Sequence, residues 1–78
     1  EGSADLVEIT LSADSPVVGD RVGDMTWPPD TALAAILRGS RVIDPTADDP
    51  LEAGDELVFV AVPEQEDALE RMLSGDRD

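Results

Sequence analysis

A tight turn feeds directly into an apolar run in the segment Leu51-Glu52-Ala53-Gly54-Asp55-Glu56-Leu57-Val58-Phe59-Val60-Ala61-Val62. Consecutive apolar residues over 57–62 are typical of a strand covered on both faces, so they predict a central strand there. In the turn, Gly54 can supply a positive φ, and the Asp55 carboxylate can accept backbone N–H bonds. Both are interpreted as structural turn residues, because the sequence offers Asp55 no partner base and no metal cluster.

Three further strands are expected around this one. Apolar and polar residues alternate over 6–11, with Val7 and Ile9 on one side, which indicates a half-buried strand. The mostly apolar segment 32–38 and the segment 41–43 are predicted to form a hairpin. Their two-residue loop, Gly39-Ser40, has Gly first, as a type II′ turn prefers.

Two helices complete the expected fold. One is predicted over 16–24, with Ser15 as its cap and Pro16 at its first position. The other is predicted over 64–73, where an apolar stripe follows acidic residues at the positive end of the helix dipole. The expected fold class is therefore α+β, a small sheet of about four strands packed with two helices. The expected domain limits are a linker stub over 1–5, one domain over 6–73 and a disordered tail over 74–78.

Charge and residue usage exclude several classes of function. The chain has 19 acidic residues and five arginines, and its net charge is −14. Such a charge repels nucleic-acid phosphates and anionic lipid headgroups. Neither cysteine nor histidine is present, which removes the usual zinc ligands and the usual general base. No apolar run approaches the roughly 18 residues that span a bilayer. We therefore predict no enzyme, no nucleic-acid partner and no direct membrane insertion.

A few side chains could still form a binding site. Arg38 and Arg41 flank the hairpin loop and could hold a phosphate, although pairing with nearby carboxylates is the favoured interpretation. Trp27 could stack a nucleobase, but such a residue more often fills the edge of a small core. Five carboxylates lie close together in sequence, without the spacing of a calcium loop: Asp44, Asp48, Asp49, Glu52 and Asp55. A solvated acidic face is expected there, with no metal site and no cofactor in this domain.

Three segments, in this order and at these separations, resemble the TrkA C-terminal domain, or RCK-C domain, of bacterial potassium transport regulators. They are Ser15-Pro16-Val17-Val18-Gly19-Asp20-Arg21-Val22-Gly23-Asp24, Ala35-Ile36-Leu37-Arg38-Gly39-Ser40-Arg41-Val42-Ile43-Asp44-Pro45 and residues 51–62. The resemblance covers roughly Leu6 to Leu73. It implies a regulatory, non-catalytic domain on the cytoplasmic side of the membrane that dimerises and possesses an effector-sensing role.

The resemblance also implies partners and ligand contacts. In this family the domain follows a nucleotide-binding RCK domain and acts on a membrane potassium transport subunit. An alternative is a module of a cation/proton antiporter or channel that binds cyclic di-AMP or another anion. The ligand contacts that it would imply are Ala35, Ile36, Arg38, Asp44 and Pro45. Ala35 and Asp44 stand where ligand-binding members tend to carry Asn and a polar or His residue.

Burial gives a separate argument for a homodimer. Both central strands carry apolar residues on both faces, with Leu33, Ala35 and Leu37 expected on one face and Ala34 and Ile36 on the other. Two helices can cover only one of these faces. If the second face were exposed to solvent, the apolar patch would be larger than a soluble monomer usually tolerates. A second copy related by a two-fold axis would cover it.

Overall fold

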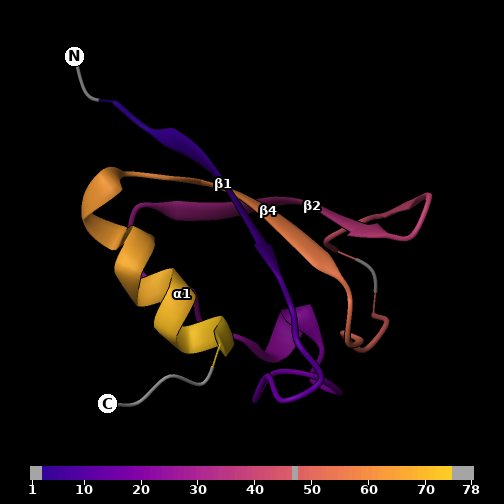
Figure 1. Ribbon diagram of the computed structural model, residues 1–78. Coiled ribbons are helices and arrows are strands. Elements are labelled where there is room, and N and C mark those ends of the chain that lie inside the picture. Colours follow the sequence, from indigo (N-terminus) through magenta and orange to yellow (C-terminus); the bar gives the residue numbers. More distant parts are fainter. Residues whose placement is uncertain (1–2, 47, 75–78) are drawn as a thin grey trace.

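The described residues, 3–46 and 48–74 of the computed structural model, form an antiparallel sheet with a helix against one face (Figure 1). The sheet has four strands in this part of the chain. The strands are β1 (Asp5–Thr10), β2 (Thr31–Arg38), β3 (Arg41–Ile43) and β4 (Glu56–Ala61). The helix is α1 (Glu66–Ser74), and two short 3₁₀ turns are η1 (Val22–Asp24) and η2 (Pro63–Gln65). The predicted α+β class is confirmed, with one α-helix in place of two.

Strand order is β1-β4-β2-β3, and every neighbouring pair is antiparallel. The apolar strand β4 lies inside the sheet, as its composition predicts. Between β2 and β3, Gly39 has a φ of +63°, whereas Ser40 is not among the residues with positive φ. Since a type I′ turn would need positive φ at both positions, this is the type II′ hairpin expected from Gly39-Ser40.

The hydrophobic core lies between α1 and the sheet face that α1 covers, which we call the inner face. Phe59 and Leu57 of β4 and Leu69 and Leu73 of α1 are almost completely buried there. The Trp27 ring meets the Phe59 ring edge-to-face, with centroids 5.1 Å apart and an interplanar angle of 75°. Trp27 therefore packs against the core and closes one edge of it.

The prediction of which β2 side chains lie on each sheet face is wrong, because β2 has a β-bulge at Ala34. The register shifts between Leu33 and Ala35, so Leu33 pairs with Phe59 while Ala35 pairs with Val58. Side chains alternate along a strand, and one extra residue reverses the alternation. Leu33 therefore shares the inner face with Ile36, and Ala35 lies on the opposite face.

The helix predicted over 16–24 is wrong, because the backbone of this segment pairs elsewhere. The Gly19 N–H donates to the Leu51 carbonyl at 2.8 Å, and the Leu51 N–H donates to the Asp20 carbonyl at 2.9 Å. Gly19 has a φ of +95°, which a right-handed helix does not allow. A chain of turns results, and only Val22–Asp24 forms a short 3₁₀ turn.

Ser15, expected as the cap of that helix, instead holds the end of α1. Its buried hydroxyl donates to the Leu73 carbonyl and accepts the Val17 N–H. The last carbonyls of a helix have no partner within the helix, so this bond satisfies one of them. The second predicted helix is confirmed, since η2 and α1 together occupy residues 63–74.

The expected terminal segments coincide only partly with described residues. Of the linker stub over 1–5, residues 1 and 2 lie outside the described residues, and Asp5 already begins β1. Of the tail over 74–78, Ser74 ends α1, and residues 75–78 lie outside the described residues. Within the described ranges, no helix has the length and apolar character needed to cross a membrane.

Candidate functional site

An ion pair between Arg38 and Asp55 is the principal polar feature of the interior. The Arg38 Nε donates to Asp55 Oδ1 and the Nη2 donates to Oδ2, both at 2.8 Å. Such a two-point contact is the strong form of an arginine–carboxylate pair. The Asp55 side chain is 1% exposed, whereas that of Arg38 is 24% exposed. The arginine thus links a buried carboxylate to the surface.

Both partners make further contacts that tie the turn before β4 to its surroundings. Asp55 Oδ2 also accepts the Glu52 N–H at 2.8 Å. Arg38 Nη2 donates to the Pro50 carbonyl at 3.1 Å, and its Nη1 lies 3.3 Å from the Glu52 carboxylate. Gly54 has a φ of +90°, which permits the tight turn that brings these groups together.

The backbone of the same turn is joined to the residue that follows β1. The Leu11 N–H donates to the Asp55 carbonyl, and the Gly54 N–H donates to the Leu11 carbonyl, both at 2.8 Å. Through Arg38 the turn is also fastened to the end of β2. The backbone of the turn and the ion pair together therefore connect three parts of the chain that are distant in sequence.

Electrostatics keep this pair ionised. The hydrogen bonds from Arg38 lower the pKa of Asp55, although burial acts in the opposite direction. The hydrogen bonds to Asp55 raise the pKa of Arg38. A carboxylate held in this way is a poor proton carrier at neutral pH, since proton transfer is most effective when the pKa lies near the working pH. The geometry therefore suits a structural clamp.

The five predicted ligand contacts fall in different environments. Ala35 lies on the sheet face opposite Ile36, and Ile36 is 2% exposed in the core. Arg38 is held by Asp55. Asp44 is exposed after β3, and its Oδ1 accepts the Thr46 N–H and hydroxyl at 2.9 and 2.8 Å, which lowers its pKa. Pro45, next to it, is half-buried. The structure does not bring the five onto one surface, and their role as ligand contacts stays a prediction.

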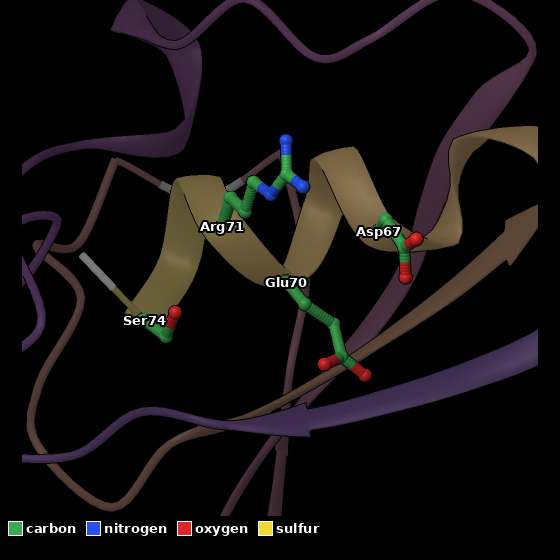
Figure 2. A pocket seen from close by; sticks show the side chains of 4 residues that line it. All are labelled: Asp67, Glu70, Arg71 and Ser74. Carbon is green, nitrogen blue, oxygen red and sulfur yellow. The ribbon is translucent and has the colours of Figure 1, made fainter. Parts of the chain in front are cut away.

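A hollow of about 230 Å³ lies on the exposed side of α1. It is lined by Asp67, Glu70, Arg71 and Ser74, and Figure 2 shows Glu70 and Arg71 pointing away from one another. Its size is below the range of about 300–1,000 Å³ usual for ligand pockets. Among the described residues, no three acidic side chains converge as a metal-binding group.

The sheet face opposite α1, which we call the outer face, is largely apolar and uncovered. Strand pairing places its side chains in three rows: Leu6, Val60 and Ala32; Glu8, Val58 and Ala35; Thr10, Glu56, Leu37 and Val42. Val42 is 72% exposed, Leu6 64% and Val60 42%. β4 is predicted to be covered on both faces. Within the described residues it is covered on the inner face, and its outer face is exposed at Val60.

Sequence reasoning missed Leu6 and Val42 as members of this face. The alternation of β1 pointed to Leu6, because Leu6 lies at the same alternate positions as the polar residues Glu8 and Thr10 and so faces the same side of the strand. Val42 is the residue of the short strand β3 that faces away from Ile43. A single exposed apolar residue is common, but several that adjoin one another, as these do on the outer face, indicate a surface that another element covers.

Comparisons with known proteins agree with the fold. A family model described as the TrkA-C domain matches residues 6–74. The Trk system potassium uptake protein TrkA of Mycobacterium tuberculosis (strain ATCC 25618 / H37Rv) is 57% identical over 72 residues, which are 92% of this chain and 33% of that protein. The Trk system potassium uptake protein trkA homolog 1 of Methanosarcina mazei is 31% identical over 75 residues, which are 96% of this chain and 18% of that protein. The chain thus spans a third or less of the length of these curated relatives.

Proposed function

The chain belongs to the TrkA-C domain family, and on that premise we propose that it is the regulatory, non-catalytic domain of a potassium uptake protein. The observation that carries the proposal is the 57% identity to the mycobacterial TrkA over 92% of the chain. In this function the domain acts on the cytoplasmic side of the membrane. Its partners are a nucleotide-binding RCK domain earlier in the same protein and a membrane potassium transport subunit.

The geometry of the polar groups supports a non-catalytic role. The carboxylate of Asp55 is 1% exposed and accepts hydrogen bonds from Arg38 and from the Glu52 N–H, so its burial and its partners keep it from an incoming reactant. The hollow on α1 is shallow and polar. A domain of this kind acts through its surfaces, by changing which partner it contacts.

Potassium uptake by the full-length protein tests this function. A host strain without its own Trk-type system would carry the full-length gene, or a version lacking residues 6–74. We expect the intact protein to restore growth at limiting potassium, and the shortened protein to take up rubidium at a markedly lower rate. Equal uptake by the two versions, at equal protein levels, would remove potassium regulation as the function of the domain.

The second part of the proposal is that the domain works as a homodimer, with a second copy covering the outer face. The support is the exposed apolar surface around Val60, which lies in the central strand β4 and is 42% exposed. Burying apolar surface contributes about 25 cal/mol per Å² removed from water. A two-fold arrangement uses one surface on both copies and closes without further assembly.

Placing a charge on this face is expected to abolish the dimer. In Val60→Glu, each interface would receive two carboxylates that have no positively charged partner, and burying them is unfavourable. Sedimentation equilibrium at moderate salt should report a dimer for the native chain and an 8.2 kDa monomer for the variant.

Val18→Glu is the matched control, because Val18 is 36% exposed but lies in the turn before η1 and belongs to none of the strands that form the outer face. It adds the same charge and should leave the dimer intact. A native chain that stays monomeric at hundreds of micromolar would refute the homodimer, as would equal weakening by both substitutions.

A further inference from the structure

We propose that pairing of two copies through the outer face is controlled by ionic strength, so that the domain dimerises more tightly as the monovalent salt concentration rises. This inference rests on the homodimer proposed above and specifies how the two faces meet. It follows from the layout of apolar and acidic side chains on the outer face.

The outer face divides along a diagonal. An apolar strip runs from Leu6 on the edge strand β1, through Val58 on β4, to Leu37 and Val42 at the hairpin. The polar side chains Glu8, Thr10 and Glu56 all lie on one side of this strip. On the other side lies Ala32, in the row of Val60. The face therefore has an apolar diagonal and a separate acidic corner.

This layout suits a second copy of the same face. When a two-fold axis lies in the interface along the diagonal, the apolar strip of one copy rests on the apolar strip of the other. The same axis places the acidic corner of each copy opposite the alanine side of its partner. The carboxylates of the two copies are thus kept on opposite sides of the axis, in contact with solvent at the rim.

The separation of the two acidic corners sets the salt dependence. Strands lie about 4.8 Å apart and packed sheets about 10 Å apart, so carboxylates on opposite sides of the axis are separated by roughly 10–15 Å. The Debye length is about 30 Å at 0.01 M salt and about 8 Å at 0.15 M. At low salt Glu8 and Glu56 therefore repel their counterparts, together with the rest of the −14 charge of each chain. Near physiological salt most of that repulsion is screened.

The small size of the face makes the repulsion decisive. A patch of four short strands measures roughly 20 Å by 15–20 Å from the usual strand dimensions. This footprint is below the about 800 Å² per partner that a standard interface buries. An association that weak is reversible, and a modest electrostatic change then alters the fraction of dimer.

The test is the dimer dissociation constant of the protein, measured by sedimentation equilibrium at about 0.01 M and about 0.15 M KCl. We expect the constant to fall about tenfold or more as salt increases, and to fall equally in NaCl, because screening depends on ionic strength and not on the ion. A constant that does not fall with salt would overturn the inference while leaving the homodimer standing. An effect of KCl that NaCl does not reproduce would overturn it as well, since it would require a bound ion.

Two matched double variants locate the charges responsible. Glu8→Gln with Glu56→Gln removes two charges from the outer face, whereas Glu64→Gln with Glu70→Gln removes two charges from η2 and α1 on the opposite side of the sheet. At about 0.01 M salt, where the acidic corners repel each other, the first pair should tighten the dimer about threefold or more, and the second should tighten it clearly less because its charges lie farther from the partner. Equal effects of the two pairs would show that total charge, and not the acidic corner, controls pairing. Circular dichroism spectra should confirm that both variants keep the native fold.

Discussion

Asp55→Ala is expected to lower the free energy of unfolding by about 2–3 kcal/mol. The substitution leaves the Arg38 guanidinium without its two-point partner and the Glu52 N–H without its acceptor. Loss of one partner from a fully buried pair costs more, but the Arg38 side chain is 24% exposed, so water replaces part of the lost interaction. Urea unfolding at neutral pH and low protein concentration measures the change.

Glu52→Ala is the control for this prediction. Glu52 contacts the same guanidinium at 3.3 Å, but its side chain is 61% exposed, so its removal should cost less than about 1 kcal/mol. Acid provides a second check. Because the pKa of Asp55 is lowered in the folded protein, its stabilising effect is complete above the ordinary Asp pKa of about 3.9 and is lost as pH falls through the lowered value. The difference between native chain and Asp55→Ala should therefore shrink below about pH 4. A cost no larger than that of Glu52→Ala would contradict the role given to this pair.

Phe59→Ala is expected to have the largest effect, a loss of about 3–5 kcal/mol. Phe59 is completely buried at the centre of β4, and the Trp27 ring packs on it edge-to-face. The total stability of a chain this short is roughly 4–12 kcal/mol, so the substitution should remove about a quarter of it or more and lower the guanidinium concentration of unfolding strongly. Guanidinium unfolding followed by Trp27 fluorescence and by far-ultraviolet circular dichroism measures the loss.

Val18→Ala gives the comparison with an exposed apolar residue, and it should change stability by no more than about 0.5 kcal/mol. Fluorescence adds a readout specific to the site, since Trp27 loses its ring contact in Phe59→Ala alone. If Phe59→Ala unfolds at the same guanidinium concentration as the native chain, the core described here is wrong.

Elements with a strong local pattern could be predicted from the sequence, whereas the bulge in β2 and the series of turns over 16–24 could not. The alternation in β1 and the apolar run in β4 identify strands by themselves, because a period of 2 and an unbroken apolar run are properties of the segment. The face assignment in β2 failed at Ala34. A bulge depends on how β2 aligns with β4, so a pattern within β2 alone does not reveal it.

The candidate site shows the same division. Gly54-Asp55 could be interpreted as a turn because both residue types favour it. The pairing of Arg38 with Asp55 could not be predicted from the sequence. The two residues are 17 positions apart, and Arg38 could have paired with any of the 19 acidic residues. Proximity in the folded sheet, where the end of β2 meets the turn before β4, selects this pair.

The sequence by itself determined the strand-forming segments, the family and the strongly acidic charge, since each depends on residue types and their spacing along the chain. Only the tertiary structure decided that the segment 16–24 forms turns, although Ser15 and Pro16 are residues that favour the start of a helix. There, backbone hydrogen bonds between Gly19, Asp20 and the distant Leu51 replace the local helical bonds. Likewise, the apolar character of Leu6 and Val42 is visible in the sequence, but pairing across four strands is what joins them into one uncovered face. The register depends on which strands pair with one another, and a pattern confined to one segment does not identify its neighbour.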